Sequence, residues 1–199
     1  MFKQGGDCMN EYDELQLIKG AKNGNKYCFE QLILAYEKQV YNIAFQYLKN
    51  QESAKDVSQE IFIKVYKYIN KFNEKSKFST WLYRIAVNAC LDEIRKNKHE
   101  LNQVTYQIDE DINIASDDLM PEVTVLEKEK KEVIYDSINQ LKKEYKTFII
   151  LRDIQGFSYK EISDITQTSI GTVKSSLSRA RGKLKTLLND TELFKDNNV

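Results

Sequence analysis

The stretch that decides the fold lies at residues 78–88 and reads Phe78-Ser79-Thr80-Trp81-Leu82-Tyr83-Arg84-Ile85-Ala86-Val87-Asn88. It reads as a helix, it includes the only tryptophan of the chain, and a lysine-rich loop with Lys71, Lys75 and Lys77 leads into it. Aromatic faces stack on unpaired bases, and nearby cations follow the phosphates. One interpretation is therefore contact with opened DNA or single-stranded nucleic acid. The other is an ordinary buried helix start with lysines on the surface.

Helical periodicity continues upstream of this stretch. Two apolar stripes predict two long helices, the first through Phe29, Leu32, Ile33, Tyr36, Val40, Ala44 and Tyr47, the second through Ala54, Val57, Ile61, Val65 and Ile69. A shorter helix is expected from Asp13 to Ala21, and the helix of the opening stretch is expected to run to about Lys96. Ser53 is the expected cap of the second long helix, and Ser79 is the expected cap of the helix in the opening stretch. Together these elements predict a helical domain over residues 10–98.

Charge is strongly segregated, although the 30 basic and 30 acidic side chains cancel. Residues 61–98 carry nine basic and three acidic side chains, whereas residues 99–127 carry eight acidic and no basic ones. The acidic stretch also lacks periodicity and holds the only proline, Pro121, so residues 99–129 are predicted to be a flexible linker. Its charge suits either a solvated linker or a polyanion that competes for a basic channel.

Four further helices are predicted in a second domain, residues 130–188, and a disordered tail in residues 189–199. Their expected ranges are Lys131–Leu141, Glu144–Ile154, Tyr159–Thr166 and Ile170–Leu188. The last two, joined by the turn at residues 167–169, have the spacing of a helix-turn-helix, whose second helix presents side chains to the major groove. Residues 171–187 hold five basic and no acidic side chains. The alternative is a helical hairpin with a solvated basic face.

Several classes of function are disfavoured by composition. Cys8, Cys28 and Cys90 are odd in number and His99 is the only histidine, so no metal site and no disulfide framework is predicted. No apolar run is long enough to span a membrane and no signal peptide is present, so the expected location is the cytoplasm. No catalytic constellation, phosphate-binding loop or cofactor motif can be assembled, so we expect neither an enzyme nor a bound cofactor.

A polar face on the second long helix is formed by Asp56, Gln59 and Glu60. Two carboxylates at positions i and i+4 repel each other slightly, and such a face can dock a basic surface of a partner. It can equally be a solvated face, with Lys64 one turn beyond Glu60 to pair with it.

Three motifs in order resemble the extracytoplasmic-function (ECF) group of bacterial sigma factors. Ala54-x-Asp56-Val57-x-Gln59-Glu60-Ile61-Phe62 is similar to the polymerase-binding helix of that family. The segment from Phe78 to Asn88, followed by Asp92 and Arg95, is similar to the part that melts and reads the downstream promoter box. Glu161-Ile162, Gly171-Thr172-Val173-Lys174-Ser175 and Arg179-Ala180-Arg181-x-Lys183-Leu184 resemble the helix-turn-helix that reads the upstream box. The resemblance covers residues 13–188 and implies an all-α chain of two domains joined by the acidic linker.

The resemblance implies a promoter-specificity subunit and assigns roles by position. Core RNA polymerase would bind Asp56, Gln59, Glu60 and Phe62. Melted downstream DNA would contact Asn73, Lys75, Lys77, Phe78, Thr80, Trp81, Arg84 and Asn88. The upstream box would contact Thr172, Lys174, Ser175, Ser178 and Arg179, with Arg181 and Lys185 on phosphates. The implied partners are core polymerase, promoter DNA and an anti-sigma factor, which could also hold the chain at a membrane.

The chain departs from the family pattern at three places. Lys142 follows Leu141 where Pro is usual, and Ser163 and Gln167 replace Ala and Gly in the helix-turn-helix, so Gln167 has to make the turn without the freedom of glycine. Two other readings stay open: a stand-alone helix-turn-helix regulator, and a helical protein-binding adaptor without DNA contact. A response-regulator receiver would need alternating strands and helices, whereas the N-terminal half reads as helical throughout.

Overall fold

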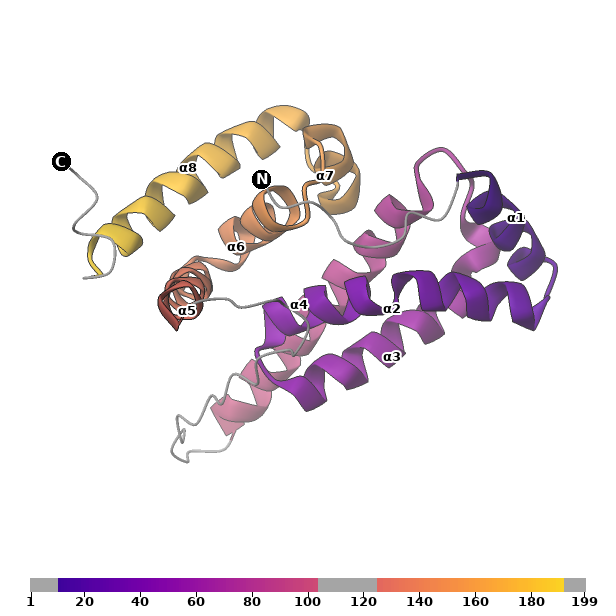
Figure 1. Cartoon of the computed structure of the whole chain (residues 1–199), viewed down its shortest axis with the longest axis horizontal. Coiled ribbons are helices and arrows are strands. Elements are labelled where there is room, and N and C mark those ends of the chain that lie inside the picture. Colours follow the sequence, from indigo (N-terminus) through magenta and orange to yellow (C-terminus); the bar gives the residue numbers. More distant parts are fainter. Residues whose placement is uncertain (1–10, 104–124, 192–199) are drawn as a thin grey trace. The chain divides into compact units, whose positions relative to one another are not determined.

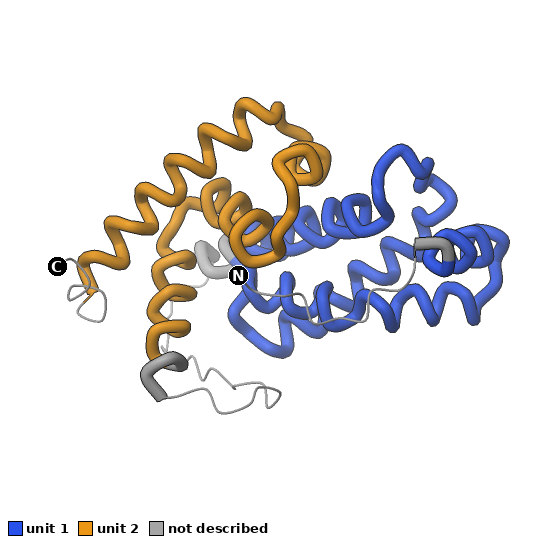
Figure 2. The backbone as a smooth tube through the Cα atoms, turned by 45° about the horizontal axis from the view of Figure 1, so that its top comes forward, with its two compact units in different colours: residues 1–108 blue, residues 109–199 orange. Residues whose placement is uncertain are grey.

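The computed structural model describes residues 11–103 and 125–191, and helices account for most of both ranges (Figure 1). No strand occurs among these residues, which confirms the predicted all-α class. The chain divides into two compact units, residues 1–108 and residues 109–199 (Figure 2). No helix in the described part of the chain is both long and apolar enough to cross a bilayer.

Unit 1 is built from α1 (Glu11–Lys22), α2 (Lys26–Leu48), α3 (Gln51–Tyr68), a 3-10 turn η1 (Ile69–Lys71) and α4 (Phe78–Gln103). Helix α2 packs against α1, α3 and α4, and α3 also packs against α4. Burial follows the predicted stripes: every apolar residue expected on the α3 stripe is buried, as are the α2 residues Leu32, Val40, Ala44 and Tyr47. Spacing of apolar residues therefore decided which face of each helix turned inward.

The two serine caps were predicted wrongly. Helix α3 is capped by Asn50, whose side-chain oxygen accepts a hydrogen bond from the backbone N–H of Ser53 at 2.9 Å. Helix α4 already begins at Phe78, and the N–H of Trp81 reaches the carbonyl of Lys77 at 3.2 Å, so Ser79 lies inside the first turn. In each case the helix begins earlier than the serine suggested: at α3 the side chain of Asn50 supplies the cap, whereas at α4 the bond from Trp81 to Lys77 is the first ordinary hydrogen bond of the helix.

Unit 2 contains α5 (Val125–Gln140), α6 (Lys143–Ile149), α7 (Tyr159–Thr166) and α8 (Ile170–Asn189). Helix α6 continues into a π-helical turn, η2 (Ile150–Ile154), where the N–H of Gln155 donates to the carbonyl of Ile150 at 2.9 Å. The apolar core of unit 2 consists of Ile138, Leu141, Phe148, Ile149, Ile150, Leu151, Ile162, Ile165, Val173, Leu177 and Ala180. Helix α8 packs against α5, α6 and α7, so it forms one long side of the unit.

Some predicted boundaries move. Helix α4 extends to Gln103 and α5 begins at Val125, so both ends of the stretch expected as a linker are helical. The rest of that stretch, residues 104–124, and residues 192–199 of the expected tail lie outside the described residues, as does Cys8. Asn189, expected in the tail, is the last residue of α8. Cys90 is buried, and Cys28 is half-buried.

The close approach of α1 to α2 at Gly20 can be tested by substitution. A Cβ added there would lie 2.4 Å from Sγ of Cys28. We therefore expect Gly20→Ala to lower the free energy of unfolding of unit 1 by about 1–3 kcal/mol through overpacking. The measurement is urea unfolding followed by the fluorescence of Trp81, which reports on unit 1.

Gly182→Ala is the matched control, because nothing lies within 4 Å of a Cβ built at that position in α8. Alanine has the higher helix propensity, so this variant should stabilise unit 2 by up to about 1 kcal/mol, measured by circular dichroism. A Gly20→Ala protein as stable as the parent would show that α1 can shift away from Cys28.

Candidate functional site

The polar face that was predicted on α3 lies at the surface of the protein. Asp56, Gln59 and Glu60 are exposed, while Phe62 is half-buried at the edge of the helix. Nζ of Lys64 lies 2.7 Å from Oε1 of Glu60, so the ion pair anticipated for a solvated face forms. Glu60 nevertheless keeps half of its side chain accessible, so the pair leaves the carboxylate open to a second cation.

An exposed apolar residue on the same face was missed by the sequence analysis. Ile63 is 53% exposed and lies seven residues after Asp56, which places it on the Asp56–Glu60 side of α3. The sequence did contain a signal for this exposure, because Ile63 lies off the apolar stripe of Val57, Ile61 and Val65. The face therefore combines two carboxylates, an amide and an isoleucine.

The aromatic residues at the start of α4 belong to the core of unit 1. Phe72, Phe78 and Trp81 are 4%, 2% and 8% exposed, and their ring centroids lie 5.4–5.6 Å from one another. Thr80 and Tyr83 are buried as well, and burial raises the pKa of the Tyr83 phenol above its usual value. Of the two interpretations of the opening stretch, the buried helix start describes these side chains.

The polar residues of the same region lie at the surface. Asn73, Lys75 and Lys77 are exposed in the loop of residues 72–77, which connects η1 to α4 and is called the 72–77 loop below. Arg84 is half-buried and Asn88 is exposed, and the two are one turn apart on α4. The expected contact set thus separates into buried rings that hold the region together and polar groups that are open to solvent.

The helix-turn-helix forms at the predicted residues. A capping box starts α7: the backbone N–H of Glu161 donates to Oγ of Ser158 at 3.2 Å, and the N–H of Ser158 donates to the Glu161 carboxylate at 2.9 Å. Gln167 ends the helix in the left-handed region with φ 55°, as its place in the turn required. Ser169 then caps α8 by accepting a hydrogen bond from the N–H of Thr172 at 3.0 Å.

The outward face of α8 carries every residue expected to contact the upstream box. Its members are exposed: Thr172, Lys174, Ser175, Ser178, Arg179, Arg181 and Lys185. Two hydroxyls are already used locally, since Oγ of Ser175 donates to the carbonyl of Thr172 at 3.1 Å and the Thr172 hydroxyl lies 2.9 Å from that of Ser169. Val173, Leu177 and Ala180 are buried on the opposite face, and Leu184 is half-buried.

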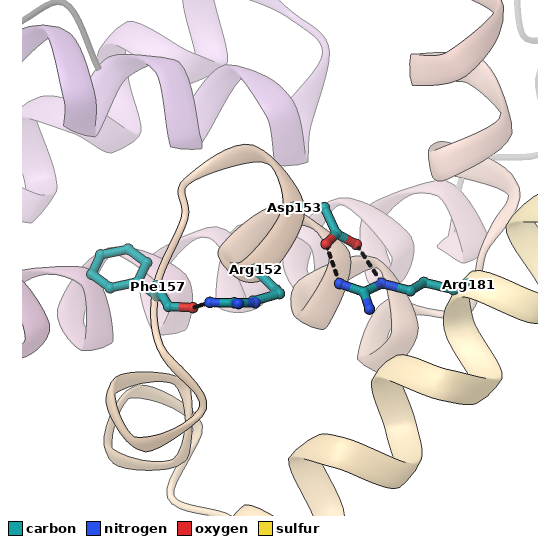
Figure 3. Close-up of polar contacts among 4 residues, drawn as sticks. All are labelled: Arg152, Asp153, Phe157 and Arg181. Atoms are coloured by element: carbon teal, nitrogen blue, oxygen red, sulfur yellow. Dashed lines mark hydrogen bonds and ion pairs between the residues drawn. The ribbon is translucent and has the colours of Figure 1, made fainter. Parts of the chain in front are cut away.

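Arg181 forms a bidentate ion pair with Asp153 of η2 (Figure 3). Its Nε lies 3.1 Å from one carboxylate oxygen, and its NH2 group donates to the other. The hydrogen bond to Asp153 raises the pKa of Arg181 above its usual value, so the guanidinium stays charged. The predicted phosphate contact is therefore engaged within unit 2 in the absence of DNA.

Two further cations, at Arg152 and Lys174, lie over the ring of Tyr159. The guanidinium carbon of Arg152 is 5.0 Å from the ring centroid, and Nζ of Lys174 is 6.0 Å from it. Arg152 also donates to the carbonyl of Phe157 at 2.8 Å, which fixes the loop before α7 (Figure 3). Neither Arg152 nor Tyr159 was singled out from the sequence, because no motif signals the π-helical turn that holds Arg152 or its packing on Tyr159 of α7.

Comparison with known proteins identifies the two units. The family model Sigma-70 region 2 matches residues 32–100, and the model Sigma-70, region 4 matches residues 131–184. The ECF RNA polymerase sigma factor SigW of Bacillus subtilis is 34% identical, in a match that covers 87% of this chain and 95% of SigW. The chain belongs to the ECF sigma factors. It is thus an alternative sigma subunit of bacterial RNA polymerase.

Two other sigma factors support the family assignment. The ECF RNA polymerase sigma-E factor of Haemophilus influenzae is 33% identical, with 83% of this chain and 89% of that protein covered. The solved structure of the sigma factor RpoE of Bartonella quintana, in complex with the anti-sigma factor NepR, superposes with a TM-score of 0.68 at 25% identity. That match covers 82% of this chain and 98% of the other.

The departures of this sigma factor from the family pattern leave the backbone intact. Gln167 takes the left-handed conformation that glycine adopts most easily, and its side-chain amide donates to the carbonyl of Asp164 at 2.6 Å. Ser163 donates its hydroxyl to the carbonyl of Thr168, inside the turn. Lys142 has φ −56°, which is close to the value that a proline ring imposes.

The Asp153–Arg181 pair supplies a prediction for this region. Asp153→Asn keeps the side-chain shape and removes the charge, so unit 2 should lose up to about 1 kcal/mol of unfolding free energy, a small value because both partners are partly exposed. The loss should shrink at about 1 M salt, where charges are screened within a few ångströms. The measurement is urea unfolding at low and high salt.

Asp164→Asn in α7 is the control for that experiment, because it removes the same charge from an exposed position of unit 2. It should leave the free energy of unfolding nearly unchanged. A loss in Asp153→Asn that is equal at both salt concentrations would contradict an electrostatic contribution from the pair.

Proposed function

We propose that this sigma factor directs core polymerase to specific promoters and opens them through three surfaces of its own chain. The observation that carries the proposal is the outward face of α8, which follows a helix-turn-helix turn and bears cations and hydroxyls but no carboxylate. A face of this kind fits the major groove of duplex DNA. The same arrangement without DNA contact would leave five cations on one helix unexplained.

The polar face of α3 is the proposed polymerase-binding surface. Asp56, Gln59 and Glu60 would pair with basic groups of the clamp subunit of the polymerase, and Phe62 would pack at the edge of that contact. Ile63 adds an exposed apolar group next to Glu60 on the same face, and burial of such a group strengthens a polar interface.

The 72–77 loop and α4 form the proposed site for melted downstream DNA. A base flipped out of the non-template strand costs a few kcal/mol, which hydrogen bonds and stacking offset. Asn73, Lys75, Lys77, Arg84 and Asn88 are the accessible members of the site. Buried Phe78, Thr80 and Trp81 would support it from beneath unless the DNA displaces a ring.

Helix α8 is the proposed reader of the upstream box. Lys174, Ser175, Ser178 and Arg179 would meet base edges, while Lys185 and Arg181 would bind phosphates, the latter after exchanging Asp153 for DNA. Thr172 lies in the first turn, where its backbone N–H already donates to Ser169. Each domain binds DNA weakly by itself, and the polymerase holds both at once, so effective concentration supplies the affinity.

Partners and location follow from the same proposal. The acidic residues 99–127 would lie in a basic channel of the polymerase that RNA later occupies. An anti-sigma factor would hold the chain inactive, as NepR binds the Bartonella quintana sigma factor. The family is not known to catalyse a reaction; we propose that this chain has no active site and acts in the cytoplasm, or at a membrane when its anti-sigma partner resides there.

The polymerase-binding surface is tested by the triple variant Asp56→Ala/Gln59→Ala/Glu60→Ala. All three positions are exposed, so the fold should persist while affinity for sigma-free bacterial core polymerase falls at least about tenfold, as expected when paired interface charges are removed. The measurements are a core-binding titration and multi-round transcription from a promoter library of a related genome.

The matched control is Glu30→Ala/Glu37→Ala/Gln39→Ala on α2, which removes the same types of side chain from exposed positions. It should bind core polymerase and initiate like the parent chain. Equal loss in both triple variants would point to net charge rather than to the α3 face. If the parent chain binds no core polymerase, the sigma-subunit function itself is wrong.

The two roles on α8 are separated by Arg179→Ala and Lys185→Ala, which each remove one exposed cation. Arg179→Ala should relax discrimination among upstream boxes by about 1–3 kcal/mol. Lys185→Ala should weaken all promoters alike and reduce the slope of log affinity against log salt by about 1. Competition binding of the polymerase complex to variant upstream boxes at several salt concentrations measures both, and identical profiles for the two variants would refute the division.

A further inference from the structure

Lys22, in the last turn of α1, makes two contacts with one part of the chain about fifty residues away. Its Nζ lies 2.8 Å from Oε1 of Glu74 and 5.3 Å from the centroid of the Phe72 ring. These two residues flank Asn73 on either side. The Lys22 ammonium group thus contacts the residues on both sides of Asn73, the first polar residue of the 72–77 loop.

Glu74 has a backbone conformation that needs support. Its φ is 59°, in the left-handed region that residues with a Cβ rarely adopt. Such a conformation persists where surrounding contacts hold it in place. The Glu74 side chain accepts a hydrogen bond from Lys22 in an ion pair. This hydrogen bond lowers the pKa of the Glu74 carboxyl group below its usual value, so the pair is charged at neutral pH.

Phe72 is held from the other side by the aromatic core. Its ring meets those of Phe78 and Trp81 at 5.6 and 5.4 Å, and its N–H donates to the carbonyl of Ile69 at 3.0 Å. Lys22 therefore lies against a ring that also packs on Phe78 at the far end of the loop. Its side chain is 22% exposed, which makes it better shielded than Glu74 at 42%.

Asn73 is oriented by this arrangement. Its side-chain oxygen accepts a hydrogen bond from the backbone N–H of Lys75 at 3.3 Å, so the amide nitrogen with its two donors is the end available to a ligand. A base presenting an acceptor edge fits such a donor. The ion pair with Lys22 also neutralises the negative charge of Glu74, which would otherwise repel the phosphates of a strand crossing the loop.

We propose that Lys22 is a positioning residue that fixes the 72–77 loop for selection of a base in the opened strand. This inference rests on the proposed function of the loop in binding melted DNA. Lys22 acts through Glu74 and Phe72, and contacts neither base nor phosphate itself. Helix α1 thereby contributes to promoter selectivity, although no motif in it was associated with DNA.

The test uses the full chain bound to sigma-free bacterial core polymerase. The probe is a promoter fired by the parent chain, prepared as fork DNA in which each unpaired non-template position carries each of the four bases. The discrimination ratio is the affinity for the best base divided by that for the worst at the most selective position. Lys22→Ala should reduce this ratio about fivefold, from the loss of a partly exposed ion pair and a cation–π contact.

Three variants separate positioning from charge and from general stability. Lys22→Arg retains both contacts and should keep the ratio within about twofold of the parent. Lys26→Ala removes one cation from the start of the neighbouring helix α2 and should also keep it. Adding Lys22→Ala to Glu74→Gln should change the ratio by less than Lys22→Ala does in the parent chain, because the ion pair is already lost and only the contact with the Phe72 ring remains to be removed.

Hydrogen exchange of the free protein gives a readout on the loop alone. In Lys22→Ala the amides of residues 72–77 should exchange several-fold faster, while those of α2 and α3 remain as in the parent. If the parent chain discriminates between bases and Lys22→Ala discriminates equally well, this inference is overturned and the proposed function stands. If the parent chain discriminates at no position, the function proposed for the loop is wrong and the inference falls with it.

Discussion

Burial of the aromatic rings of Phe72, Phe78 and Trp81 is the constraint on which the 72–77 loop and the start of α4 depend. Phe72 and Phe78 lie at the two ends of the 72–77 loop, and both pack against Trp81 within a core that α2 and α3 complete. Fixing both ends restricts the loop to few conformations, so a ligand that binds it loses little further entropy on ordering. The rings therefore hold the loop from the core without facing the solvent, and Asn73, Lys75 and Lys77 between them stay accessible.

A zero net charge conceals surfaces of opposite sign. The α3 face carries carboxylates, whereas the outward face of α8 carries cations, and the two lie in separate units. Each surface is small and partly neutralised by its own neighbours, as the Lys64–Glu60 and Arg181–Asp153 pairs show. Such pairs weaken binding to an isolated partner and favour assemblies in which several contacts form together.

Periodicity predicted the helices well and predicted their ends unevenly. Helix α7 was expected at its observed bounds, and the structure shows why they are sharp: Ser158 and Glu161 form a capping box at its start and Gln167 ends it. The caps at Ser53 and Ser79 were wrong: Asn50 caps α3 and α4 already begins at Phe78, so both serines lie inside their helices. The Asp153–Arg181 and Lys22–Glu74 pairs join residues 28 and 52 positions apart, and such pairings depend on packing that no local pattern encodes.

The turn of the helix-turn-helix illustrates how packing overrides local preference. Glycine would adopt the left-handed conformation at residue 167 at no steric cost, whereas glutamine pays roughly 1 kcal/mol for it. Ile162 and Ile165 before the turn and Val173 after it are fully or almost fully buried, and burying each such side chain contributes about 1.5–3 kcal/mol. The apolar contacts outweigh the strain, and the amide of Gln167 recovers part of it by bonding the carbonyl of Asp164. The angle between α7 and α8, and with it the presentation of the basic face, is therefore set by the core beneath the turn and tolerates the loss of glycine.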